Sequence, residues 1–229
     1  MLKFGVIAEG PSDQAVIENI LLGYFQNEAE EPVINPVQPP PTPPGAPGGW
    51  TLVFESLKRG DPQKALQFND YVVIHIDTDV QEESGFDVAK REQGKELSVP
   101  DRIARVIDRL KKEIDVEFLK ANVHRLLFAV AVDSIECWLL PLLFDKKKAG
   151  KTTGCLKAAN DALRKANRNG LSAGETKFPL AYDQASRDYT KRKKLMELHD
   201  KNPSLELFVQ QLDNLQNRLA ANQQGELPT

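Results

Sequence analysis

Three nearly continuous apolar runs predict buried strands. They cover residues 2–8, 71–77 and 123–133, and in none of them do apolar and polar positions alternate. A strand that is apolar on both faces is typical of a parallel sheet covered by helices on both sides. Residues 50–60 form a fourth ordered segment that is compatible with either a strand or a helix.

Apolar residues at helical spacing lie between these runs. Residues 13–25 and 100–114 each carry such a stripe, and residues 61–68 are a candidate for a short helix. Because strands and helices alternate, we predict an α/β fold, a parallel sheet of about four strands flanked by helices.

The pattern of apolar residues in the last part of the chain predicts helices. Apolar residues recur at helical spacing in 155–166 and 204–219, and 183–200 is a third, basic helical candidate. We therefore predict an α/β domain over residues 1–145 and a helical C-terminal extension over 146–229 that packs on it.

Residues 32–49 hold eight of the fifteen prolines in the chain. Such a segment cannot form a helix or a central strand, so we predict a surface loop with polyproline character. Two interpretations stay open: a passive excursion from the domain, or a loop that contacts a partner or substrate.

The composition of the 229 residues is that of a globular protein, with a net charge of −3 and a pI of about 5.7. Any nucleic-acid binding would therefore need a local basic patch. The two cysteines, Cys137 and Cys155, are far apart in sequence and fit no zinc-binding pattern. With no signal peptide and no apolar run long enough for a membrane span, we expect a soluble, cytoplasmic protein with reduced thiols.

Acidic residues follow the predicted strands. Glu9 ends the first strand, Asp77 and Asp79 end the next long one, and Asp133 ends the third with Glu136 close behind. The carboxyl ends of parallel strands meet at one edge of a sheet, where ligands bind. We expect these acids to converge there.

Asp77 and Asp79 are two residues apart, so in a regular strand both side chains point the same way. Two such carboxylates can hold Mg²⁺ or Mn²⁺, although a solvated acidic pair is the simpler interpretation. Asp13 could add a metal contact or stabilise the start of a helix. Glu136 lies in an apolar segment and could be a further ligand or an acid at a helix N-terminus.

The segments "VIAEGPSD" and "VVIHIDTD" resemble the TOPRIM domain of topoisomerases, primases and OLD-family nucleases. The resemblance covers roughly residues 2–140 and depends on Glu9-Gly10 followed by Asp77-Thr78-Asp79. The segment "DSIECWLLP", residues 133–141, looks like one found in small bacterial TOPRIM-like proteins related to the nuclease half of OLD proteins, often in defence contexts.

The resemblance implies a Mg²⁺-dependent nuclease. Glu9, Asp77 and Asp79 would form the metal-site core, with Glu9 as a ligand or a general acid/base, and Asp13 and Glu136 would be auxiliary. Divalent ions neutralise a scissile phosphate and activate water, and we favour water over tyrosine as the nucleophile. The chain carries no ATPase half, so any ATP dependence would come from a separate partner protein.

Two basic segments could supply local positive charge for a nucleic acid. One contains Lys146, Lys147, Lys148 and Lys151, and the other Arg187, Lys191, Arg192, Lys193 and Lys194. Either segment could instead be a solvated charge run. The "GKTT" at 150–153 lacks the glycine and preceding strand of a phosphate-binding P-loop, so we reject nucleotide binding there.

The sequence thus favours a metal-dependent nuclease acting on DNA or RNA, and the resemblance implies an effector of anti-phage defence. A second hypothesis is a catalytically weak TOPRIM-like binding or regulatory module that partners an ATPase. A third is another phosphoryl-transfer enzyme that uses the same acidic edge.

Overall fold

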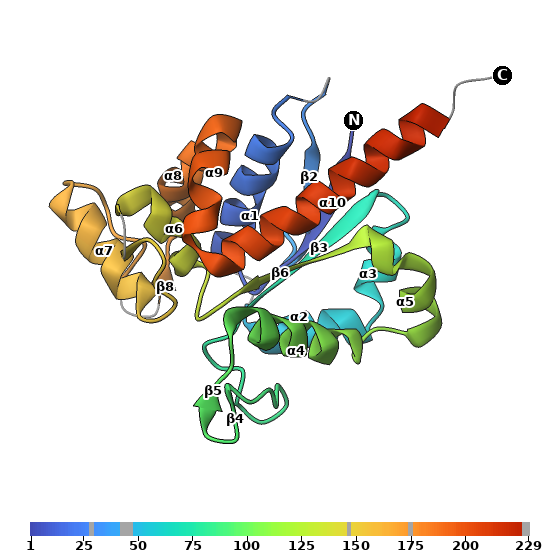
Figure 1. The fold of residues 1–229 in the computed structure, drawn as a ribbon, viewed down its shortest axis with the longest axis horizontal. Helices are drawn as coiled ribbons and strands as arrows, with labels where there is room; N and C mark the ends of the chain where they lie inside the picture. Colours follow the sequence, from blue (N-terminus) through green and yellow to red (C-terminus); the bar gives the residue numbers. More distant parts are fainter. Residues whose placement is uncertain (28–29, 42–47, 146–147, 174–175, 226–229) are drawn as a thin grey trace.

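The computed structural model describes residues 1–27, 30–41, 48–145, 148–173 and 176–225. At its centre is a four-stranded, all-parallel sheet in the order β2-β1-β3-β6 (Figure 1). The strands are β1 (Lys3–Ile7), β2 (Val33–Gln38), β3 (Tyr71–Asp77) and β6 (Leu126–Ala131). The predicted α/β fold class is therefore confirmed.

Helices cover both faces of the sheet (Figure 1). On one face lie α1 (Pro11–Tyr24), α6 (Glu136–Leu143), α7 (Cys155–Lys165), α8 (Pro179–Ser186), α9 (Arg192–Leu198) and α10 (Pro203–Gly225). On the other lie α2 (Trp50–Lys58), α3 (Asp61–Ala65), α4 (Val99–Lys111) and α5 (Val116–Asn122). Each face has its own apolar core.

Shorter elements complete the described chain. Two small hairpins pair β4 (Arg91–Glu92) with β5 (Lys95–Glu96), and β7 (Ser172–Ala173) with β8 (Thr176–Lys177). Single 3₁₀ turns are η1 (Val123–Arg125), η3 (Arg187–Thr190) and η4 (His199–Lys201).

The double cover explains the continuous apolar strands. In β3, Val73 packs into the core beneath α1, while Ile74 and Ile76 pack into the core beneath α2 and α4. Each of these side chains is completely buried. Both faces of the strand therefore favour apolar residues, as the sequence pattern predicted.

The C-terminal helices share a core with the sheet. The side chain of Asn19 on α1 donates a hydrogen bond to Ser186 Oγ on α8, 2.8 Å away. Phe208 of α10 stacks on Trp138 of α6, with ring centroids 5.5 Å apart. The predicted extension thus packs on the α/β part, and it completes one of the two cores.

One local prediction is corrected: residues 33–38, expected to be loop, form strand β2. The segment 50–60, which was compatible with either a strand or a helix, forms helix α2 over residues 50–58. Pro36 is tolerated because β2 lies at the edge of the sheet, where a residue without an N–H does not interrupt a ladder. The central part of the proline-rich segment, residues 42–47, lies outside the described residues.

Cys137 and Cys155, far apart in sequence, lie side by side in the structure. Cys137 opens the first turn of α6, Cys155 is the first residue of α7, and the two sulfurs form a disulfide. The expected free thiols are therefore not found, because the packing of α6 on α7 brings residues 18 positions apart together. The cytoplasmic location stays a prediction. In the part of the chain described here, none of the helices is long and apolar enough to cross a membrane.

Candidate active site

Two neighbouring parallel strands bring Glu9 and Asp77 together. Glu9 lies two residues after β1, and Asp77 is the last residue of β3. The backbone N–H of Asp77 donates a hydrogen bond to Glu9 Oε1, 2.7 Å away. The prediction that these two acids share one edge of the sheet is confirmed.

Asp13 and Glu136 approach the same place from helix N-termini. Asp13 is in the first turn of α1 and Glu136 is the first residue of α6, and both are almost fully buried. Glu9, Asp13, Asp77 and Glu136 together are called the acidic cluster below. They influence one another's ionisation, as their pKa values show.

A lysine from the distant β7–β8 hairpin reaches into the cluster. Lys177 Nζ lies 3.1 Å from Glu136 Oε1 and 3.8 Å from Asp13 Oδ1. The hydroxyl of Tyr182 on α8 donates a hydrogen bond to Glu136 Oε1. The Lys177 side chain is 37% exposed, so its ammonium group borders both the buried acids and the solvent.

Three members of the cluster hold protons more tightly than usual. Burial raises the pKa of Glu9 from 4.5 to about 8, and the charges of Asp13 and Asp79 add to this. Burial also raises the pKa of Asp13 from 3.8 to about 6, against the opposing effect of Lys177. The pKa of Asp77 is raised well above 3.8 by burial and by Glu9 and Asp13. One ammonium group is too little charge for all four carboxylates to ionise comfortably.

Glu136 behaves differently. Burial acts to raise its pKa, but Lys177 and the hydroxyls of Ser134 and Tyr182 outweigh that effect, and the pKa is lowered. Lys177 responds reciprocally: burial acts to lower its pKa, but Asp13, Glu136 and Asp77 raise it overall. Glu136 and Lys177 therefore form an ion pair inside the cluster.

Several buried polar atoms at this edge have no hydrogen-bond partner among the described residues. They are Asp13 Oδ1, Asp77 Oδ1 and the ring nitrogens of His75. His75 Nε2 lies 3.5 Å from Asp77 Oδ1, and burial lowers the pKa of the ring to about 3, so the imidazole is neutral. Buried polar atoms are rarely left unpaired, because each costs about 1–3 kcal/mol.

A divalent cation at this cluster stays a prediction, because among the described residues no three members of the cluster bring ligand atoms within 4.8 Å of one another. Carboxylate oxygens are the ligands that Mg²⁺ and Mn²⁺ prefer, and the cluster has more negative charge than Lys177 neutralises. Glu9, Asp13 and Asp77 are the residues that would hold such an ion. Glu136 is less suited, because Lys177 and Tyr182 already occupy its Oε1.

Asp79 is not part of the buried cluster. β3 ends at Asp77, so the alternation that would point Asp77 and Asp79 the same way stops before Asp79. The Asp79 side chain is exposed, and its Oδ1 accepts a hydrogen bond from the N–H of Val80. It remains close enough to raise the pKa of Glu9. Its role as a ligand stays a prediction.

The ends of β3 and β6 are fixed to each other. Thr78 N–H donates to the carbonyls of Ala131 and Asp133, and Asp133 N–H donates to Thr78 Oγ1 at 2.9 Å. Asp133 has a φ of 69°, a left-handed conformation that is unusual outside glycine. Its carboxylate accepts hydrogen bonds from the N–H groups of Gly154 and Cys155 at the start of α7. The acid that was expected at the edge thus caps α7.

Asp133 also lies within 4.8 Å of both cysteine sulfurs, a possible three-ligand group. Disulfide-bonded sulfurs have no thiolate to offer a metal, so in this state the group is not a metal site.

The proline-rich segment borders the acidic cluster at both of its described ends. Gln14 Nε2 donates to the carbonyls of Gln38 and Pro39, 2.9 Å from each. The N–H of Gly49 donates to the carbonyl of Glu9 at 2.8 Å. Both interpretations of the segment, a passive excursion and a loop that contacts a partner or substrate, stay predictions.

The predicted basic residues fall into two places. Lys148 and Lys151 precede α7 and line a pocket beside it, whereas Lys146 and Lys147 lie outside the described residues. The second group lies near the far end of α1, because Arg192 donates to the carbonyl of Tyr24. That end is about 16 Å from Asp13 along the helix.

Most of the second group is engaged within the protein. Arg187 pairs with Asp183, Lys191 with Asp188, and Lys194 with Glu197. Arg192 also lies over the ring of Tyr24, and Lys193 is exposed. Nucleic-acid contact by this group stays a prediction.

Sequence reasoning missed Lys177 and the hydrogen bond of Tyr182 to Glu136. Tyr182 and Tyr189 are both fully buried. Lys177 lies a hundred residues after Asp77, and no local pattern marks it. The one available signal was His75, a polar residue in an otherwise apolar strand, two positions before Asp77 and on the same face.

No family model, curated protein or solved structure matched the chain. The resemblance to TOPRIM therefore depends on Glu9-Gly10, Asp77-Thr78-Asp79 and the strands that precede them.

Proposed function

We propose that the chain is a metal-dependent nuclease that cleaves phosphodiester bonds of DNA or RNA. The observation that carries the proposal is the pair of buried carboxylates of Asp13 and Asp77 beside Glu9, whose Oδ1 atoms accept no hydrogen bond among the described residues and of which Asp13 has Lys177 3.8 Å away. Such an arrangement is costly without a cation, and acids arranged around divalent ions are a recurrent solution for phosphoryl transfer. The order Glu9 then Asp77-x-Asp79 at neighbouring parallel strands also supports a TOPRIM-like assignment.

Glu9, Asp13 and Asp77 would hold Mg²⁺ or Mn²⁺, with Asp79 at the exposed rim. When bound, the ion would neutralise charge on the scissile phosphate and lower the pKa of a water molecule. The chain itself supplies the rigidity of the site. The disulfide and the Thr78–Asp133 hydrogen bonds keep the strand ends and the adjoining helices in place.

Lys177 would bind a non-bridging phosphate oxygen. Its ammonium group is partly exposed and is held by Glu136 and Asp13, so it is oriented before a substrate arrives. A fixed positive group at the place where negative charge develops stabilises the transition state. Glu136 and Tyr182 act through Lys177 and position it.

Glu9 would hold or accept a proton near neutral pH. Its Oε1 accepts the N–H of Asp77, so a proton on this carboxyl resides on Oε2. In the absence of metal, a carboxyl whose pKa is about 8 can exchange a proton at physiological pH, and a cation bound beside it would lower that pKa.

The test is nicking of supercoiled plasmid by purified protein with Mg²⁺ or Mn²⁺. We expect metal-dependent nicking that is lost in Asp77→Asn, an isosteric change that removes the charge. Asp108→Asn, at an exposed position of α4, is the matched control and should cleave normally.

Absence of cleavage by the wild-type protein on plasmid, single-stranded DNA and RNA with either metal would refute the nuclease proposal. The hypothesis of a module that partners an ATPase would then take its place. Equal activity of Asp77→Asn and the wild type would instead show that the cleavage comes from a contaminant or from another site.

A further inference from the structure

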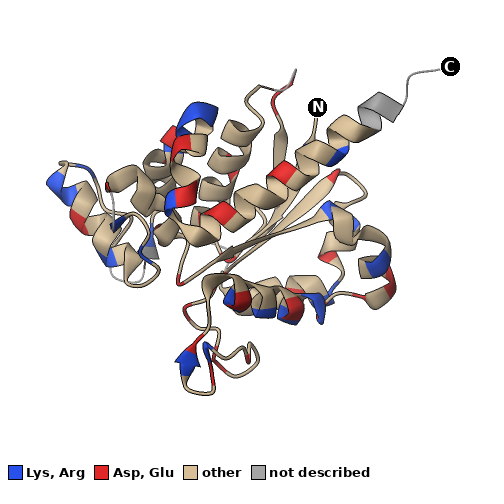
Figure 2. Ribbon diagram, in the orientation of Figure 1, with Lys and Arg blue, Asp and Glu red and all other residues tan. Residues whose placement is uncertain are grey.

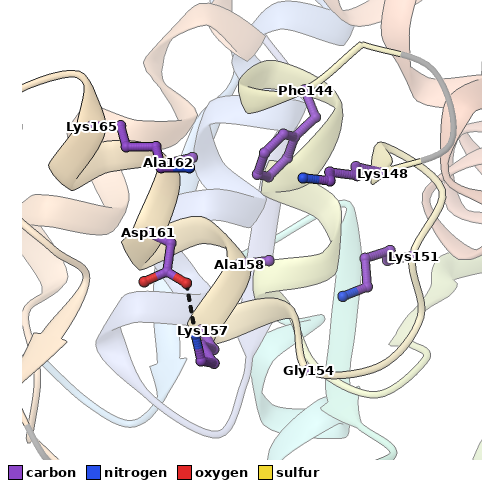
Figure 3. A pocket seen from close by; sticks show the side chains of 9 residues that line it. All are labelled: Phe144, Lys148, Lys151, Gly154, Lys157, Ala158, Asp161, Ala162 and Lys165. Carbon is purple, nitrogen blue, oxygen red and sulfur yellow. Dashed lines mark hydrogen bonds and ion pairs between the residues drawn. The ribbon is translucent and has the colours of Figure 1, made fainter.

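A pocket lined by lysines lies between α7 and the segment that leads into it. Its volume is about 230 Å³, and four of its nine lining residues are lysines (Figure 3). The lysines are Lys148, Lys151, Lys157 and Lys165, and Asp161 is the one acidic residue of the lining. Figure 2 shows the same positive charge along α7 in the context of the whole fold.

The pocket has more positive charge than its own acid neutralises. Lys157 Nζ pairs with Asp161 Oδ2 at 2.8 Å. Lys148 Nζ lies over the ring of Phe144, 5.4 Å from its centroid, and no ion pair within the described residues involves Lys151 or Lys165. In Figure 3 the ammonium groups of Lys148 and Lys151 are turned toward α7. The pocket is therefore built to receive an anion.

The pocket is joined to the acidic cluster by short connections. Gly154 lines the pocket, and its N–H donates to the carboxylate of Asp133. Asp133 in turn is hydrogen-bonded to Thr78, the residue after Asp77. The disulfide ties the first residue of α7 to α6, which begins with Glu136. A strand whose scissile phosphate lies at the cluster could therefore continue into the pocket.

The spacing of the lysines suits a chain of phosphates better than a single one. Lys157 and Lys165 are eight residues apart on α7, which corresponds to about 12 Å along the helix. Successive phosphates of one strand advance by about 3.4 Å along a duplex axis, so a strand would offer several charges over that length.

We propose that this lysine pocket binds the phosphate backbone of the nucleic-acid substrate next to the scissile bond. The proposal rests on the proposed nuclease function and adds a place for the flanking strand. The lining offers ammonium groups and little to read base edges, so binding there is independent of sequence.

The experiment measures binding without cleavage. Fluorescence anisotropy of a labelled oligonucleotide is recorded with the full-length protein in EDTA, over a series of NaCl concentrations. Lys151→Glu/Lys165→Glu changes two of the three lining lysines that have no ion pair among the described residues; the third, Lys148, lies over the ring of Phe144. The matched control, Lys3→Glu/Lys112→Glu, reverses two exposed charges that belong to neither basic segment.

We expect the pocket variant to bind at least about tenfold more weakly. Its plot of log affinity against log salt concentration should be shallower by about 2, one for each lost phosphate contact. The control variant should keep the wild-type affinity and slope. Equal losses in the two variants, or no loss in the pocket variant, would overturn the proposal.

Two further measurements, competition by inorganic phosphate and cleavage by the variants, show which of the two proposals is wrong. If inorganic phosphate displaces the oligonucleotide better than NaCl of equal ionic strength, the pocket takes a small anion and the strand proposal is wrong. If Asp77→Asn binds normally and the wild type never cleaves, the nuclease proposal fails while the pocket stands. If the wild type cleaves and the pocket variant keeps its KM, the pocket proposal fails alone.

Discussion

The raised pKa of Glu9 makes stability depend on pH in an unusual direction. In the folded protein without metal Glu9 keeps its proton up to about pH 8, whereas in the unfolded chain it loses the proton near pH 4.5. Between these values the folded state binds more protons, so the free energy of unfolding falls as the pH rises. The loss stops once the pH passes the folded pKa.

The magnitude follows from the size of the shift. Each pH unit within the window costs about 1.4 kcal/mol, which gives a fall of about 2 kcal/mol between pH 6.5 and 8 from Glu9 alone. Asp77, whose pKa is also raised, steepens the fall. Below pH 6.5 His75 opposes it, because the buried imidazole has a pKa of about 3 and only the unfolded one takes up a proton.

Urea denaturation in EDTA at several pH values from 6.5 to 8 measures this effect. Glu9→Gln keeps an acceptor for the N–H of Asp77 but cannot titrate. The slope of its unfolding free energy against pH should therefore be shallower than that of the wild type by about 1.4 kcal/mol per pH unit. Glu55→Gln, an exposed change on α2, should keep the wild-type slope. A wild-type stability that is flat or rises over this range would refute the reasoning, as would an unchanged slope in Glu9→Gln. Saturating Mg²⁺ should abolish the fall, since a bound cation favours the ionised acids.

Three other perturbations test separate parts of the structure. Replacing Cys137 and Cys155 by serine should lower the free energy of unfolding by about 3 kcal/mol, because the disulfide closes a loop of 18 residues. Urea denaturation with and without a reductant measures the loss. If the reductant does not lower the stability of the wild type by the same amount, the disulfide is not the cause. Gly23→Ala should cost about 3 kcal/mol or more, because its Cβ would lie 1.7 Å from the carbonyl oxygen of Tyr189, and thermal unfolding would show it as a lower Tm. Lys177→Met should lower the free energy of unfolding by about 1–3 kcal/mol at pH 7, which is less than for a fully buried ion pair because the lysine is partly exposed. Lys177→Arg should keep part of that stability, and thermal unfolding measures both variants.

The parts of the fold that the sequence predicted are those with a strong local signal. The continuous apolar runs around Val73 and Leu127 identify strands buried on both faces, and the acids that follow them predict the edge where Glu9 and Asp77 meet. The prediction for Asp79 failed in its geometry because the last residue of a strand cannot be read from the pattern, and β3 ends at Asp77.

Other parts depend on tertiary context. Proline argues against a strand, and only the position of β2 at the sheet edge makes Pro36 acceptable. Lys177 joins the acidic cluster because strand β8, which carries it, and helix α8 fold back toward α1. No spacing of residues in the sequence predicts that contact. The disulfide escaped prediction for the same reason, since it depends on how α6 packs against α7.

The packing of α8 and α9 on α1 also has a consequence for the order of folding. Helix α1 is among the first elements to leave the ribosome, yet Asn19 and Gly23 are covered by residues 183–190, synthesised more than 160 positions later. Each strand pair in the sheet is likewise non-local, with Phe4 beside Tyr71 and Val72 beside Leu126. Contacts of this range must wait for most of the chain and fold slowly. A fragment ending near residue 145 would therefore leave the apolar face of α1 open to solvent and prone to aggregate, and the nascent chain faces the same exposure until its last helices emerge.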